Sequence, residues 1–324
     1  VTHASMLPAM KKISVTPTIS GAYADSSQLV AFNLGGANEL FILESLSKPD
    51  RKIFSPGFAT FFKTQPDNLQ FYELTVYCTS GTKLKAIRLE GEKFNITDIQ
   101  PIQDGYLLVS PRCHRKSTTD IENNGRRYNS SGTLIGEVTL GDGIQQILVS
   151  EDQTIWVSYF DEGIFGNYGW NDPLGASGLV AWSLDGKKLY EFEPKEGLDY
   201  IADCYAMNLD AEGNIWCCYY TDFPIVKINT DKRLEHWESP VKGASSLAVD
   251  FPYVLFIGGY EDPNLFQIVQ LNPDGTSKML RQFHLENSLG DALTLEHVAV
   301  RGKSVSIAAA GDIYVVSVPE LLWQ

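Results

Sequence analysis

Short apolar runs separated by polar turns recur along the whole chain and predict a series of β-hairpins. The two clearest copies are SEDQTIWVSYFD (150–161) and DAEGNIWCCYYTD (210–222). In both, a polar turn precedes an Ile-Trp pair and a short strand that ends in aromatic residues and an aspartate. A strand-like segment precedes each copy, so each copy predicts a strand, a tight turn and a second strand. Weaker copies of the pattern occupy residues 35–45, 103–112, 250–262 and 301–316.

A second hairpin follows most copies, for example in GLVAWSLDGKKLYEFEP (178–194) and PIVKINTDKRLEHWESP (224–240). Two hairpins make a four-stranded antiparallel unit, and such units recur about every 50 residues. A single sheet of this kind cannot bury both of its faces, whereas sheets stacked radially around an axis can. The repeat therefore predicts an all-β fold, a six-bladed β-propeller with blades at 28–92, 94–140, 144–194, 202–240, 243–286 and 295–318.

The two ends of the chain bear on how the ring closes. The last predicted blade has only three strands, and the strand KKISVTPTI (11–19) is expected to supply the fourth. Closure by a terminal strand removes an exposed sheet edge. We interpret residues 47–72 as an insertion, and seven blades are the alternative if these residues belong to another blade. A β-sandwich lacks such tandem hairpins, so the whole chain, 1–324, is predicted to be one propeller domain.

Composition narrows the class of partner. The chain has 40 acidic and 26 basic residues and a net charge of −14, which disfavours nucleic acid and anionic membranes, because phosphate binding needs a basic surface. We see no apolar run near 18 residues and no secretion signal, so we expect a soluble, cytoplasmic monomer. The five cysteines include no C-x-x-C pair, which agrees with reduced thiols. Cys217 and Cys218 are adjacent on a predicted strand and should point to opposite faces.

The segment DAEGNIW (210–216), and more loosely SEDQTIW (150–156), resembles the blade signature of the six-bladed superfamily that includes NHL-repeat and gluconolactonase-like proteins. WVSYFDEGIFGNYGW (156–170) is also similar to a segment of uncharacterised bacterial propellers. The resemblance covers roughly the central hundred residues well, and the rest only as spaced hairpins of WD40-like or NHL-like repeats. It implies an architecture but no reaction, because this superfamily holds hydrolases, lyases, lactonases and binding modules.

The lactonases of that superfamily hold a divalent metal on the axis with a glutamate, an asparagine and an aspartate. Their aspartate lies five residues before the repeat aspartate. The same offset here gives Gln145, Tyr205 and Ser245, and only Glu296 is a carboxylate at an axial position. A hard cation prefers several oxygen ligands with carboxylates among them. No cofactor is therefore evident from the sequence and no metal residue is assigned, and a divalent cation stays an alternative that the axial residues do not support.

The loops that join the second and third strands of each blade are the candidate site, because binding residues concentrate on loops held by a rigid scaffold. Three adjacent blades contribute acids and aromatic residues to these loops, and the second blade contributes a basic loop opposite them. Aromatic residues with polar edges suit polar ring ligands. The alternative is that the aromatic residues pack the loops and the aspartates cap turns. The predicted binding residues are Tyr159, Asp161, Glu162, Trp170, Tyr220, Asp222, Tyr260, Asp262, Arg112 and His114.

These observations favour a ligand-binding or protein-interaction propeller with an aromatic and acidic pocket on one face. Its partner would be a small polar ligand or a peptide segment of another protein. The alternative is an enzyme, such as a hydrolase, lyase or lactonase, that uses the same face, and no catalytic residue is assigned. The histidines show no zinc spacing, and neither a G-x-S-x-G elbow nor a P-loop is present.

Overall fold

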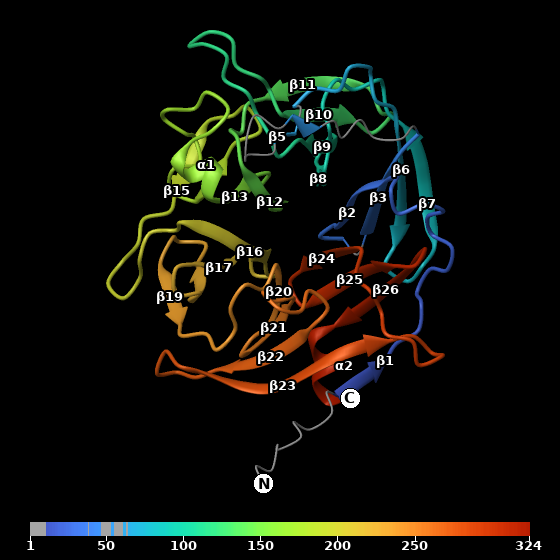
Figure 1. The fold of residues 1–324 in the computed structure, drawn as a ribbon, viewed down its shortest axis with the longest axis vertical. Coiled ribbons are helices and arrows are strands. Elements are labelled where there is room, and N and C mark those ends of the chain that lie inside the picture. The colour runs from blue at the N-terminus through green and yellow to red at the C-terminus, as the bar shows by residue number, and fades with distance from the viewer. Residues whose placement is uncertain (1–10, 38, 47–52, 55–60, 63) are drawn as a thin grey trace.

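The computed structural model of the protein describes residues 11–37, 39–46, 53–54, 61–62 and 64–324, which form a ring of six β-sheets around a central axis (Figure 1). The first blade contains β2 (Leu29–Leu34), β3 (Glu39–Ser45), β6 (Tyr72–Cys78) and β7 (Lys83–Arg88). The second contains β8 (Asp98–Ile102), β9 (Gly105–Val109), β10 (Gly125–Asn129) and β11 (Leu134–Val138). The third contains β12 (Ile144–Val149), β13 (Ile155–Tyr159), β14 (Leu179–Trp182) and β15 (Lys188–Glu191).

The fourth blade contains β16 (Asp203–Leu209), β17 (Ile215–Tyr220), β18 (Ile225–Ile228) and β19 (Leu234–Trp237). The fifth contains β20 (Ser246–Asp250), β21 (Tyr253–Ile257), β22 (Phe266–Leu271) and β23 (Ser277–Glu286). The sixth contains β24 (His297–Arg301), β25 (Ser304–Ala309) and β26 (Asp312–Ser317). The all-β class and the six-bladed ring are therefore confirmed.

Burial along the strands follows the position of each strand in its blade. Strand β2, next to the axis, is buried along its whole length, because each blade packs between two neighbours. Outer strands expose much of their length: every residue of β7 is exposed or half-buried, and the side chains of β15 alternate in exposure. Cys217 and Cys218 illustrate the two faces of one strand. Cys217 packs toward the third blade and Cys218 toward the fifth, as the sequence predicted.

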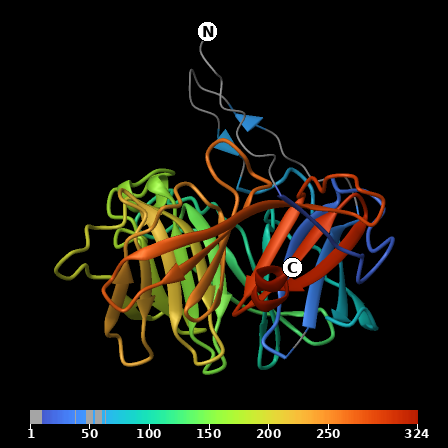
Figure 2. The ribbon, with the colours of Figure 1, turned by 90° about the horizontal axis from the view of Figure 1, so that it is seen from below.

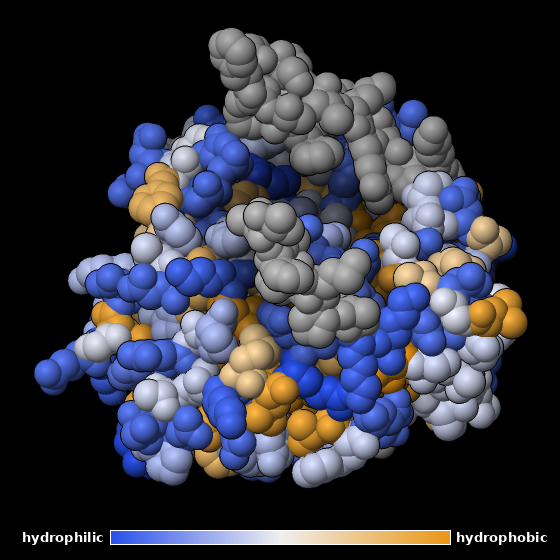
Figure 3. Space-filling model, turned by 60° about the horizontal axis from the view of Figure 1, so that its bottom comes forward, coloured by the Kyte–Doolittle hydropathy of each residue, from blue (hydrophilic) through white to orange (hydrophobic). Residues whose placement is uncertain are grey.

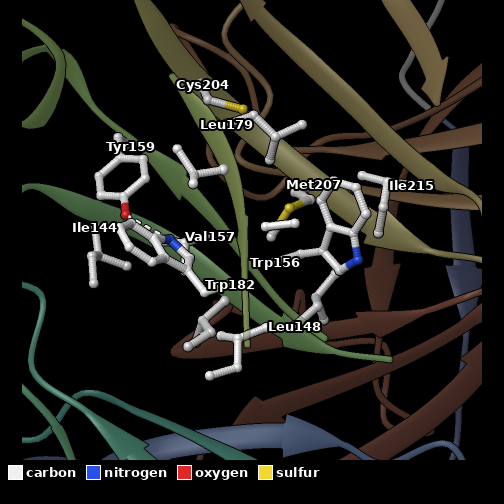
Figure 4. Close-up of a cluster of buried hydrophobic side chains, with 14 of the residues drawn as sticks. Ile144, Leu148, Trp156, Val157, Tyr159, Leu179, Trp182, Cys204, Met207 and Ile215 are labelled. Atoms are coloured by element: carbon white, nitrogen blue, oxygen red, sulfur yellow. Dashed lines mark hydrogen bonds between the residues drawn. The ribbon is translucent and has the colours of Figure 1, made fainter. Parts of the chain in front are cut away.

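The largest buried cluster extends across the second, third and fourth blades, and Figure 4 shows part of it. Trp156 of β13 packs near Met207 and Ile215 of the fourth blade. Figure 2 shows the blades from the side, standing next to one another with their strands running between the two faces of the ring. On the face seen in Figure 3, hydrophobic residues form small separate patches among hydrophilic ones.

The N-terminal segment joins the fifth and sixth blades. Strand β1 (Lys11–Ser14) pairs in parallel with β23, at the outer edge of the fifth blade. The chain then crosses to the sixth blade, where Ile19 bridges to Ile313 of β26. The expectation that KKISVTPTI supplies the fourth strand of the sixth blade is therefore wrong for the strand itself, which belongs to the fifth blade, and only the isolated bridge at Ile19 reaches the three-stranded sixth sheet. The terminal segment links the last two blades of the ring.

The remaining elements are short. Strands β4 (Ile53–Phe54) and β5 (Phe61–Phe62) form a two-stranded sheet inside the segment that we interpreted as an insertion, so the six-bladed count holds. Most of residues 47–63 lie outside the described residues. The helices within the described ranges are α1 (Asp161–Phe165) and α2 (Val318–Trp323). Among the described residues, no helix is long and apolar enough to cross a membrane.

The replacement Ile13→Ala is expected to lower the free energy of unfolding by ~2 kcal/mol, because the side chain is 4% exposed and its removal leaves a cavity against the fifth blade. The adjacent replacement Lys12→Ala is the control. It removes only an exposed ion pair to Glu286 and should cost less than about 0.5 kcal/mol. Urea unfolding measures both, and equal losses would contradict a closing role for β1.

Candidate functional site

The antiparallel order of the strands gives the ring two different faces. One face, which we call the loop face, carries the segments between the second and third strands of the blades, such as 160–178, 221–224 and 258–265. The opposite, hairpin face carries the turns between first and second strands, such as 150–154 and 210–214. All ten binding residues predicted from sequence lie on or next to the loop face.

Two of the predicted residues are buried and hold the long loop 160–178 in place. Tyr159 is 0% exposed, and its hydroxyl donates to the carbonyl of Leu140 (2.5 Å) and accepts from Trp182 Nε1 (3.2 Å; Figure 4). Trp170 is 5% exposed and donates from Nε1 to the carbonyl of Cys113 (2.7 Å). Neither side chain is available to a ligand. The loop folds over both, since Gly175 packs directly on the Tyr159 ring.

Arg112 is held between the second and third blades. Its guanidinium pairs with Asp142 (2.9 Å) and Glu162 (2.6 Å) and stacks on the ring of Tyr168 (4.2 Å to the centroid). Burial raises the pKa of Asp142 to about 6 against the opposing effect of Arg112. His114 packs edge-on against the same tyrosine (6.0 Å between centroids). The Arg112 charge is therefore paired within the protein and is not directed at a ligand.

Two other predicted acids occupy separate positions. Asp262 accepts a hydrogen bond from His284 Nε2 (2.6 Å). Burial would raise the pKa of Asp262, but the hydrogen bonds from His284 and from the backbone N–H of Asn264 outweigh it and lower the pKa. Asp222 is exposed, and its side chain makes no hydrogen bond to a residue that the structure describes. Neither acid contacts the other.

Aromatic residues from the fourth and fifth blades form a second group of contacting side chains on the loop face. The hydroxyls of Tyr205 and Tyr260 are hydrogen-bonded (3.1 Å), with the ring centroids 5.9 Å apart. Phe223 packs edge-on behind both rings, 5.1 Å and 5.8 Å away, and Tyr220 packs against Phe223. Tyr260 is 62% exposed and Tyr220 45% exposed, so this cluster offers aromatic surface to solvent.

Asp203 is the first residue of β16 and adjoins this aromatic cluster. It is half-buried, and burial, reinforced by the charge of Asp161, raises its pKa to about 6. The charges of both acids also act on Tyr205, so the three groups lie near one another. Within the described part of the chain, the Asp203 carboxylate has no hydrogen bond and no ion pair. We name Asp161, Asp203, Tyr205, Tyr220 and Tyr260 the acidic–aromatic cluster.

The structure brings three of the predicted residues into this cluster, namely Asp161, Tyr220 and Tyr260. Sequence reasoning missed Asp203 and considered Tyr205 only as an axial position that lacked a carboxylate. No local pattern identifies Asp203 as part of a site, because Asp161 and Tyr260 come from other blades.

A narrow polar channel of about 190 Å³ follows the axis and is lined by residues of the innermost strands, including Asn33, Asp98, Gln145 and His297. Asp98 accepts a hydrogen bond from Asn33 Nδ2 (3.0 Å), and burial raises its pKa to about 7. Glu296 instead accepts from the hydroxyl of Tyr23 (2.5 Å), which ties it to the N-terminal segment. In the part of the chain that the structure describes, no group of three or more His, Cys, Asp or Glu residues is arranged to hold a metal ion.

Comparison with known proteins gives one family match. The model of the YxzG family matches residues 179–316, which run from the third blade to the sixth. No curated protein matches the sequence.

Several solved structures are similar to this chain at low identity. Virginiamycin B lyase from Staphylococcus aureus is 11% identical, with 90% of this chain and 94% of that chain covered and a TM-score of 0.49. A streptogramin B lyase is 12% identical, with 91% and 95% covered and a TM-score of 0.48. The PQQ-bound aldose sugar dehydrogenase from Streptomyces coelicolor is 11% identical, with 93% and 96% covered and a TM-score of 0.48. Similarity at this level carries no chemistry over to this chain.

Proposed function

We propose that this protein is a ligand-binding propeller whose acidic–aromatic cluster holds the cationic group of a small molecule. The observation that carries the proposal is the half-buried Asp203 carboxylate, which has no partner among the described residues and stands beside a second acid, Asp161. Leaving a carboxylate partly desolvated without a partner costs free energy. A bound ammonium group would offset that cost.

The aromatic members of the cluster suit the same ligand. Exposed tyrosine rings attract alkylammonium and quaternary ammonium groups through their π faces. Tyr205 and Tyr260 are fixed by their mutual hydrogen bond and by Phe223, so little conformational entropy is lost on binding. The net charge of −14 also attracts cations toward the protein.

The test is calorimetric titration of the wild type with methylammonium, tetramethylammonium and guanidinium chlorides, with sodium chloride as the reference. The variant Asp203→Asn is expected to bind the preferred cation about tenfold more weakly, because one charge-assisted contact is lost. The control is Asp120→Asn, which makes the same charge change at an exposed position on the second blade. Equal loss in both variants, or no binding by the wild type, would overturn the proposal.

The variant Asp203→Asn should also change the pH dependence of stability. Because the pKa of Asp203 is raised from 3.8 in the unfolded chain to about 6, the wild type loses stability as pH rises between these values. Asparagine does not titrate, so the variant should melt higher than the wild type at pH 8, with the difference shrinking toward pH 4. Solvent exposure keeps the gain small. A constant difference across this range, measured by thermal melting, would contradict the raised pKa.

An enzyme is the second candidate, and Asp98 is the observation that favours it. A pKa of about 7 would let this carboxyl exchange a proton near neutral pH, as a general acid or base must. Asp98 is the only carboxylate among the residues that line the axial channel as described. If the protein is a hydrolase or a lyase, the variant Asp98→Asn should abolish turnover in a substrate screen without altering ammonium binding.

We also propose that the protein acts in the cytoplasm as a monomer. Support comes from the cysteines, all five of which are free, with four of them buried. Reduced thiols are typical of that compartment. Size-exclusion chromatography with light scattering should give a mass near 36.0 kDa, and a dimer mass would contradict the monomer.

A further inference from the structure

The hairpin face holds a larger cavity at the opposite end of the axis from the acidic–aromatic cluster. Its volume is about 510 Å³, within the range of small-molecule sites. Turns from four blades line it, at residues 34–36, 150–154, 209–213 and 301–304. Because each turn is anchored by a blade, the cavity walls are rigid.

Arg301 is the charged group at the floor of this cavity. It is the last residue of β24, and its guanidinium reaches across the axis to donate from Nη2 to the carbonyl of Val149 in the third blade (2.9 Å). Gly36 leaves room for it, since a Cβ there would approach Nη2 to 3.3 Å. Its Nη1 is buried without a hydrogen-bond partner in the described residues. Arg301 forms no close ion pair with any described carboxylate, although the charges of Glu151 and Glu39 act on its guanidinium from a greater distance.

The acids and lysines around the cavity differ in how many hydrogen bonds they make within the protein. Asp210 is occupied by its own turn, accepting from Trp216 Nε1 (2.7 Å) and from the backbone N–H of Asn214 (2.8 Å). Asp152 likewise accepts from the hydroxyl of Ser150 (2.5 Å). Lys303 and Lys232 are exposed at the rim, with Lys232 over the ring of Trp156 (4.5 Å). Both acids are therefore engaged by their own turns, whereas the two lysines form no ion pair with a carboxylate that the structure describes.

Two further acids, Glu151 and Glu212, are exposed on the same rim. They would repel a bare anion at the mouth, but they accept hydrogen bonds from hydroxyl groups. A ligand that places an oxyanion at Arg301 and hydroxyl groups toward the rim satisfies both sets of side chains.

We propose that the hairpin-face cavity binds a small hydroxylated oxyanion, a carboxylate or phosphate ester, with Arg301 as its anchor and Lys232 and Lys303 beside it. This site is separate from the proposed cation site, because the two lie on opposite faces of the ring. A guanidinium donates to either oxyanion through a pair of N–H groups. The side chain would shift by a rotation that brings Nη1 toward the ligand.

The experiment is calorimetric titration of the full chain with glycerol phosphate, glycerate and inorganic phosphate. Binding of glycerol phosphate or glycerate by the wild type, weakened about tenfold or more in Arg301→Met, is the expected result. The matched control is Arg281→Met, which removes an arginine that donates only to backbone carbonyls, those of Leu321 and Leu322 (2.8 and 3.0 Å). Unchanged binding in Arg301→Met, equal weakening in Arg281→Met, or no binding by the wild type overturns the proposal.

A second variant covers the case in which Arg301→Met does not fold. The double variant Lys232→Met, Lys303→Met changes exposed rim residues and should weaken the same ligand several-fold, whereas unchanged affinity counts against the site. The same variants distinguish the cation site from the oxyanion site. Asp203→Asn should leave oxyanion binding intact, and Arg301→Met should leave ammonium binding intact.

Discussion

The variant Arg126→Met is expected to lose ~3–5 kcal/mol of unfolding free energy, because it leaves the buried Glu92 carboxylate without its positively charged partner. Arg126 is 4% exposed, and its Nε donates to Glu92, which is 1% exposed (2.9 Å). The hydroxyl of Tyr128 donates to the same carboxylate oxygen (2.5 Å), and Arg126 also pairs with Glu137. Without the arginine, Glu92 keeps two neutral donors, the hydroxyl of Tyr128 and the backbone N–H of Lys93, and no paired countercharge.

Urea unfolding followed by tryptophan fluorescence measures this loss. Arg127→Met is the control, because its side chain forms one loose pair (3.8 Å) with the 88% exposed Asp185. Adding Glu92→Gln to Arg126→Met should restore part of the stability, since the unpaired charge of Glu92 is then removed. A loss in Arg126→Met no larger than that in Arg127→Met would contradict a buried ionic link between the first and second blades.

The variant Trp216→Ala is expected to cost ~3–5 kcal/mol, the usual range for a fully buried tryptophan. Trp216 is 1% exposed, stacks on Trp237 at 5.7 Å and donates from Nε1 to Asp210 (2.7 Å). Its removal opens a cavity between the fourth and fifth blades and breaks the contact that holds the 210–214 turn. The Ile-Trp pair of the repeat is thus a packing feature.

Far-UV circular dichroism is the suitable probe for this variant, because it does not depend on tryptophan emission. The control is Trp323→Ala, in which the removed side chain is 79% exposed and the expected change is below about 0.5 kcal/mol. Similar midpoints for the two variants in urea would show that Trp216 does not support the blade packing described above.

The fold was predictable because its signal is local. Each hairpin of a blade is encoded by a short stretch such as 150–159 or 210–220. The stacking of the blades follows from the need to bury both faces of each sheet. The partner of β1 was not predictable in the same way. The pattern KKIS identifies a strand with Ile13 inward, but nothing in it distinguishes the edge of the fifth blade from that of the sixth.

The site was only partly predictable, for two physical reasons. Composition does not show whether a loop aromatic faces solvent or folds inward, so Tyr159 and Trp170 seemed equivalent to the exposed Tyr260. A β-bulge between Cys204 and Ala206 also shifts the register of β16, so counting positions along the strand misjudges which side chains meet. The surroundings of Asp203 depend on three separate blades, which no local pattern encodes.

The central claim, that the Asp203 carboxylate binds a cation, is tested most directly by titrating the wild type with the preferred ammonium ion at several pH values between 5 and 8. A proton competes with the cation for the same carboxylate, whose pKa is about 6. The account predicts constant affinity above pH 7 and an affinity at pH 5 about tenfold lower, and no such fall in Asp203→Asn. Affinity that stays constant from pH 8 to pH 5 in the wild type would contradict it.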